Sequence, residues 1–131
     1  MARCKKLEAK KMRDFKKYEI WNDSMKLVKQ IYQFTLCMPK EEKFGLISQM
    51  CRAAISIPSN IAEGTSRNSD IEFKRFLEIA IGSSFELETQ LLLCVEIGFT
   101  NEETILPIIN EINKIQKQTN NLILKIKQDN K

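Results

Sequence analysis

The fold is decided by residues 69–98, which read SDIEFKRFLEIAIGSSFELETQLLLCVEIG. Apolar residues recur there every three or four positions, which is the spacing of an α-helix that buries one face. Ser69 and Glu72 have the spacing of a capping box, in which each side chain binds a free backbone N–H of the first turn. Gly98 is typical of the residue that follows the end of a helix. The stretch therefore predicts one helix over residues 70–97, roughly 40 Å long.

The apolar surface of this predicted helix is wider than the interior of one bundle requires. Beside the main stripe, Ile81, Phe85 and Leu92 form a flanking stripe, so apolar residues occupy more than half of the circumference. We expect the flanking stripe to be covered by another chain or by a second helix of the same bundle. The main stripe consists of Phe73, Phe76, Leu77, Ala80, Ser84, Leu87, Leu91, Cys94 and Val95.

Three further helical patterns surround this one. They cover residues 20–36, 42–66 and 101–128, and a second capping box, Thr100 to Glu103, opens the last of them. Pro58 should kink the second helix, because it lacks an N–H and crowds the carbonyl of Ala54. The connections are short, so consecutive helices must run antiparallel. The sequence predicts an all-α, antiparallel up-down-up-down four-helix bundle.

The positive charge is concentrated at the start of the chain. Residues 1–19 contain eight basic and three acidic side chains, whereas the remaining residues contain 13 basic and 14 acidic ones. We expect residues 1–14 to be a flexible basic extension and residues 15–131 to be the bundle domain.

Several classes of site are excluded by composition. The chain has no histidine, so Ser-His and Cys-His catalysis and histidine-based zinc sites are ruled out. The four cysteines are scattered, which favours reduced core thiols over a disulfide or metal framework. No apolar run is long enough to span a membrane, and no signal sequence is recognisable. We expect a cytoplasmic protein without enzymatic activity, cofactor or metal.

Basic residues in and near the extension are the candidates for nucleic-acid contact. Phosphate contacts by such residues would make binding strongly dependent on salt. Two other interpretations stay open: a solubilising tail, and pairing of Lys74 with Asp70 and of Arg75 with Glu72 on a helix surface. Phe15 and Tyr18 alone are too few for a base-stacking platform. The candidates are Lys5, Lys6, Lys10, Lys11, Arg13, Lys16, Lys17, Arg67, Lys74 and Arg75.

A second set of polar residues is interpreted as structural. Ser59 and Asn60 follow Pro58 and could satisfy the carbonyls that it frees, while Glu88 should pair with Arg52 or a hydroxyl. The alternative is a binding surface formed by Asn60, Glu63 and Arg67. A di-metal site is not expected, because no Glu-x-x-His motif is present. The predicted structural cluster is Arg52, Ser59, Asn60, Glu63 and Glu88.

Five motifs carry a family resemblance. They are FKKYEIW at 15–21, PKEEKFGL at 39–46, RAAISIPSNIAEG at 52–64, EFKRFL at 72–77 and GSSFELETQL at 82–91. With these motifs, residues 12 to about 127 resemble the 23S rRNA-intervening-sequence proteins, also called the S23 ribosomal protein family. Residues 1–11 lie outside the resemblance.

The resemblance implies a cytoplasmic bacterial four-helix bundle that assembles as a ring-shaped homopentamer. Family members are encoded within intervening sequences of 23S rRNA genes, and related bundles are accessory proteins of diversity-generating retroelements that bind nucleic acid and a reverse transcriptase. The resulting prediction is a non-enzymatic oligomer associated with RNA or DNA, with a reverse transcriptase as a possible partner by analogy. The alternative is a protein-interaction scaffold without nucleic-acid binding.

Overall fold

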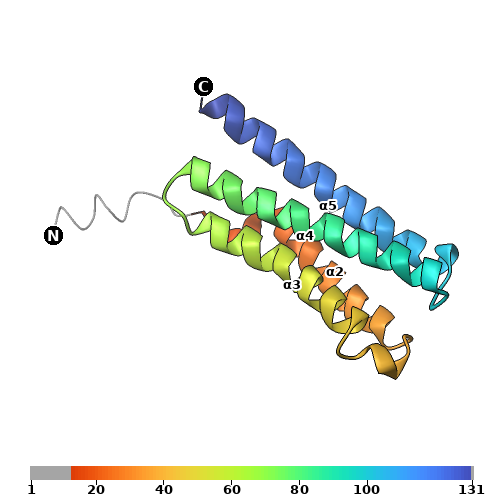
Figure 1. Ribbon diagram of the computed structural model, residues 1–131. Helices are drawn as coiled ribbons and strands as arrows, with labels where there is room; N and C mark the ends of the chain where they lie inside the picture. Colours follow the sequence, from red (N-terminus) through yellow and green to blue (C-terminus); the bar gives the residue numbers. More distant parts are fainter. Residues whose placement is uncertain (1–12, 131) are drawn as a thin grey trace.

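The computed structural model describes residues 13–130, and this part of the chain is all-α, with no β-strand. Four helices account for most of it, as Figure 1 shows, and two short 3₁₀ turns precede and follow the first helix. The elements are η1 (Phe15–Lys17), α2 (Glu19–Thr35), η2 (Lys40–Glu42), α3 (Leu46–Thr65), α4 (Asp70–Ile97) and α5 (Glu102–Asp129).

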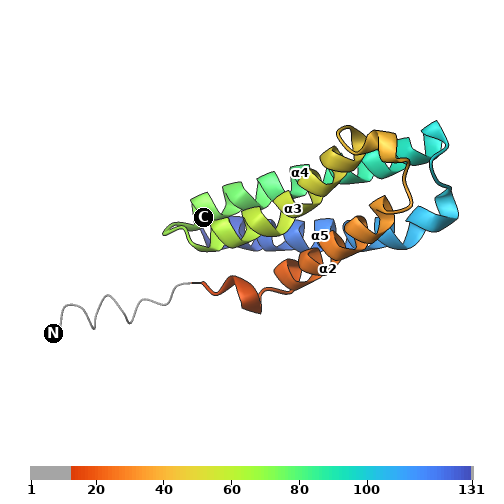
Figure 2. The same cartoon turned by 90° about the horizontal axis from the view of Figure 1, so that it is seen from below.

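Each helix packs antiparallel against two neighbours, in the order α2, α3, α4, α5 around the bundle. Asp70 at the start of α4 contacts Asn130 just after α5, and Cys94 near the end of α4 approaches Met50 near the start of α3. The predicted up-down-up-down bundle is therefore confirmed. The first and the last described residues both lie at the end of the bundle that holds the α3–α4 turn (Figure 2).

One continuous apolar core holds the four helices together. Each helix contributes fully buried side chains, and these follow the three- and four-residue spacing in the sequence. Burying one such Leu or Ile stabilises the fold by about 1.5–3 kcal/mol, before conformational entropy is counted. Representative members are Leu27 in α2, Ile57 in α3, Leu87 in α4 and Ile112 in α5.

The ends of the α4–α5 hairpin are determined by local capping. Ser69 accepts a hydrogen bond from the backbone N–H of Glu72 at 3.1 Å, and Gly98 ends α4 with φ +93°, which favours glycine. The capping box expected at Thr100 was wrong by one position. Asn101 is the N-cap, because its side-chain oxygen accepts both the N–H and the hydroxyl of Thr104, at 2.8 Å each.

The start of α3 differs from the prediction. The helix was expected from Glu42 but begins at Leu46, because residues 40–42 form a separate 3₁₀ turn and Gly45 leaves the helical region with φ −109° and ψ −113°. The Glu42 carboxylate then accepts the N–H of Leu46 at 3.3 Å. Further along, α3 continues through the buried Pro58.

The flanking stripe of α4 is only partly covered by the chain's own helices. Ile81 is partly buried and packs against the core, but Phe85 is 55% and Leu92 49% exposed. Of the two alternatives, cover by a second helix of the same bundle therefore does not apply to Phe85 or Leu92, and cover by another chain stays a prediction for them. The two residues are seven positions apart and lie on one side of α4.

Candidate nucleic-acid interface

Six of the ten predicted nucleic-acid contacts lie near the α3–α4 end of the bundle. Arg13 touches the turn between α3 and α4, Lys16 and Lys17 follow in η1, and Lys74 and Arg75 are in the first turns of α4. Arg67 belongs to the turn itself. The other four candidates, Lys5, Lys6, Lys10 and Lys11, lie outside the described residues.

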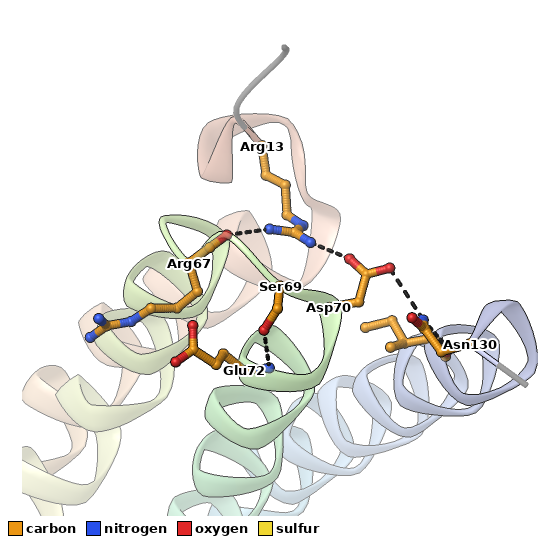
Figure 3. A network of polar contacts seen from close by, with 7 residues as sticks. Arg13, Arg67, Ser69, Asp70, Glu72 and Asn130 are labelled. Carbon is orange, nitrogen blue, oxygen red and sulfur yellow. Dashed lines mark hydrogen bonds and ion pairs between the residues drawn. The ribbon is translucent and has the colours of Figure 1, made fainter. Parts of the chain in front are cut away.

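Arg13 anchors the chain to this end (Figure 3). Its guanidinium donates to the backbone carbonyl of Arg67 at 2.6 Å and pairs with the carboxylate of Asp70. The same group lies over the ring of Phe73, 4.7 Å from its centroid. The second oxygen of Asp70 accepts from the Asn130 amide at 3.3 Å. These contacts connect the first described residue with the α3–α4 turn and with the end of α5.

The anchor changes the interpretation of two predicted residues. Arg13 was expected to be free for phosphates but is used within the protein, and its side chain is only 22% exposed. Asp70 was expected to pair with Lys74 but pairs with Arg13 instead. The local sequence could not show that Asp70 pairs with Arg13 and not with Lys74, because Arg13 and Asp70 are 57 positions apart in the sequence.

The pKa of Asp70 is lowered, first by the hydrogen bond from Asn130 and then by Arg13. A carboxylate with a lowered pKa in the folded protein stabilises the fold above its unfolded pKa, and this contribution is lost as the pH falls through the folded pKa. At neutral pH both partners of the anchor are charged. Because the side chain of Asp70 is 42% exposed, solvent screens the pair and we expect its contribution to global stability to be small.

The remaining basic residues are weakly engaged. Arg67 lies 3.9 Å from Glu63 and stacks over Phe76 at 4.8 Å, and Lys74 lies 3.9 Å from Glu78. Exposed pairs of this kind contribute about 0–1 kcal/mol, so phosphates can replace them at little cost. The expected pair between Arg75 and Glu72 is not formed. No ion pair holds Lys16, Lys17 or Arg75 within residues 13–130.

The net charge comes from residues 1–12, which we call the basic leader. It contains five basic side chains and one acidic side chain, whereas residues 13–131 contain sixteen of each. The bundle itself is therefore neutral overall, and the +4 charge of the chain is that of the leader. Arg13, the residue that follows the leader in the sequence, contacts the α3–α4 turn at the carbonyl of Arg67.

The predicted structural polar residues do not form one cluster. The Asn60 amide donates to the carbonyl and hydroxyl of Ser56, at 2.8 and 2.9 Å, and Ser56 bonds to Ser83 of α4 at 2.8 Å. Asn60 therefore helps to connect α3 with α4 and does not compensate for Pro58 at the carbonyl of Ala54. Glu63 pairs with Arg67.

Glu88 and Arg52 also differ from the prediction. Glu88 accepts from the Gln116 amide of α5 at 3.0 Å and does not bind Arg52 or a hydroxyl. The expected pair was wrong because Glu88 faces α5, whereas Arg52 is exposed on α3. Arg52 and Ser59 make no side-chain hydrogen bond or ion pair to any other described residue.

Potential metal ligands are not clustered in the described range. No group of three or more Cys, Asp or Glu side chains there is placed to hold a metal ion. Burial raises the pKa of the Cys94 thiol, which disfavours the reactive thiolate. Over residues 13–130, none of the helices combines the length and the apolar character that crossing a membrane requires.

The sequence model of the 23S rRNA-intervening sequence protein family matches residues 16–121. The chain belongs to this family. A solved structure from the S23 ribosomal protein family, a protein of unknown function from Bacteroides thetaiotaomicron, is 26% identical to this family member. The similarity covers 79% of this chain and 97% of that chain, with a TM-score of 0.74. No curated protein matches this intervening-sequence protein significantly.

The range of the family match divides the candidate interface. Lys16, Lys17, Arg67, Lys74 and Arg75 lie inside it, whereas the basic leader and the Arg13 anchor precede it. The family assignment therefore supports the bundle fold. The basic charge of the leader lies outside the residues that match the family.

Proposed function

We propose that this intervening-sequence protein is a non-enzymatic, oligomeric bundle that associates with RNA or DNA through its α3–α4 end and its basic leader. One observation carries the proposal: the whole net positive charge belongs to a leader that Arg13 attaches beside further basic side chains. Phosphate neutralisation by such groups releases counterions, and this drives sequence-independent binding. The bundle would serve as the scaffold that positions these groups.

The test is the salt dependence of binding to a labelled single-stranded RNA, measured by fluorescence anisotropy on the full chain. If about five phosphates are neutralised, the affinity for a single strand should fall about a hundredfold between 50 and 200 mM salt. Chloride replaced by glutamate at equal ionic strength controls for specific anion effects. Absence of binding to RNA and DNA at the lowest salt would contradict the proposal and favour a scaffold that binds only proteins.

Oligomerisation is supported by the exposed side of α4. Phe85 and Leu92 remain about half exposed on one side of this helix. Large apolar side chains grouped on one face are typical of a surface that another chain covers. A second copy is the occupant that we expect, and the family resemblance favours a pentameric ring.

Phe85→Glu should abolish this assembly, because a carboxylate buried between two chains would lack a partner. Light scattering should then report a particle mass near that of one 15.3 kDa chain. Phe44→Glu is the matched control, since Phe44 is 89% exposed on the α2–α3 connection and the same substitution there should leave the mass unchanged. An unchanged mass for Phe85→Glu would exclude this face as the interface.

A further inference from the structure

An open apolar groove of about 400 Å³ lies between α2 and α3, near the α3–α4 end. Its first wall comes from η1 and α2, with Phe15, Trp21 and Met25, and the second comes from α3, with Ile55, Pro58 and Ser59. The volume is in the range of about 300–1,000 Å³ that small-ligand sites occupy. The groove lies outside the apolar core, against which Trp21 and Val28 of its lining pack.

Aromatic rings form the first wall. Phe15 lies edge-on to Trp21, with ring centroids 5.0 Å apart and an interplanar angle of 65°. Trp21 is half-buried, so part of its ring is held by the bundle while the rest faces the groove. Pro58 cannot donate a backbone hydrogen bond, and Ile55 is 42% exposed opposite the rings. The groove is therefore a slot for a flat, largely apolar group.

Three basic residues lie close in sequence to the lining of the groove, and one of them, Lys16, lies against a lining ring. The Nζ atom of Lys16 lies 5.8 Å from the centroid of the Phe15 ring. Lys17 is adjacent in sequence, and Arg52 precedes Ile55 by three positions, which places it on the same side of α3. None of these three cations forms an ion pair within the described part of the chain.

Two acidic residues lie close in sequence to the lining of the groove, and each has a contact of its own. Asp14 accepts the backbone N–H of Lys16 at 3.1 Å and so caps η1, and Glu63 pairs with Arg67. Ser59 adds an exposed hydroxyl to the groove that makes no side-chain hydrogen bond to other described residues. An apolar slot with Lys16 against one wall and further cations close in sequence is complementary to a ligand that combines flat rings with anionic groups.

We propose that this groove binds an unpaired base of single-stranded nucleic acid, stacked on Trp21, while Lys16, Lys17 and Arg52 contact the flanking phosphates. The inference rests on the proposed function and deepens it by naming the form of nucleic acid that is recognised. Stacking on aromatic side chains tolerates any base, because every base has a π face. A base within a duplex is stacked on its neighbours and is not available to the groove. Phe15 and Tyr18 alone are too few for a base-stacking platform, and Trp21 adds a further ring.

Trp21 makes the groove directly observable, because it is the only tryptophan of the chain. The full chain is titrated with a short single-stranded oligonucleotide while tryptophan fluorescence and the anisotropy of a label on the oligonucleotide are followed together. We expect the fluorescence to be quenched in parallel with binding. An abasic oligonucleotide of the same length should bind through its phosphates without quenching, and a duplex should quench weakly.

Substitutions in the groove separate stacking from phosphate contact. Trp21 also packs against the core, so the variant of choice is Ser59→Glu, which places a carboxylate at an exposed position of the groove. We expect about tenfold weaker binding of the single strand and a smaller loss for the abasic oligonucleotide, because the carboxylate repels the phosphates of both but blocks base stacking only in the first. Asn121→Glu is the matched control, because it makes the same charge change at an exposed site on α5.

The outcomes of these binding experiments distinguish the groove proposal from the proposed function. Single-strand binding without quenching, or equal effects of the two glutamate variants, would overturn the groove proposal and leave the proposed function intact. Absence of any nucleic-acid binding would overturn both. Quenching by polyglutamate but not by RNA would identify the groove as a site for acidic peptides and would overturn the base-binding inference.

Discussion

Deletion of residues 1–11 should weaken binding to single-stranded RNA about a hundredfold or more at about 50 mM salt. The deletion removes five basic side chains and one acidic side chain, so the remaining chain carries no net charge. It also preserves Met12 as a start and keeps Arg13, whose contacts with Asp70 and Arg67 hold the beginning of the bundle in place. In an oligomer the effect is multiplied, because several leaders act at high effective concentration on one strand.

Two controls show whether charge is the cause. A full-length chain with a scrambled leader keeps the charge and should retain the affinity, whereas replacement of Arg3, Lys5, Lys6, Lys10 and Lys11 by glutamine should reproduce the deletion. The melting temperature of the truncated chain should match that of the full chain. If the truncated chain binds RNA as tightly, the leader is not part of the interface. The contacts must then come from the end surface formed by Lys16, Lys17, Arg67, Lys74 and Arg75.

Gly64→Ala should destabilise the bundle, although alanine is the better helix former by about 1 kcal/mol. A Cβ atom at position 64 would lie 2.7 Å from the Cβ of Phe76 and 3.1 Å from the ring of Phe73. The neighbouring atom at 2.7 Å is the root of a side chain and cannot swing away, so α3 and α4 would have to separate. Overpacking of this kind typically costs about 1–3 kcal/mol.

The net effect should be a loss of up to about 2 kcal/mol, which lowers the melting temperature by up to about 8 °C. Gly82→Ala is the matched control, because Gly82 also lies inside a helix but has nothing within 4 Å of an added Cβ. That substitution should raise the melting temperature, since only the gain in helix propensity remains. If both substitutions raise it, the close approach of α3 and α4 at Gly64 is wrong.

The fold was largely predictable from the sequence, because its determinants act over one or two helical turns. The apolar spacing over 70–97 and the caps at Ser69 and Gly98 are properties of neighbouring residues, and α4 has the predicted bounds. The short connections then permit only antiparallel neighbours. The errors lie at the starts of α3 and α5. Gly45 and Asn101 are the N-cap residues there, and neither was predicted as the N-cap.

The candidate site was less predictable. The sequence indicated that its first residues are basic, but it could not show that Arg13 binds Asp70 or that Glu88 binds Gln116. It also could not show that Phe15 and Trp21 face Pro58 across a groove. These residues belong to elements whose relative rotation and axial offset are determined by core packing. A long-range contact depends on both quantities, and neither is encoded in the spacing within a single helix.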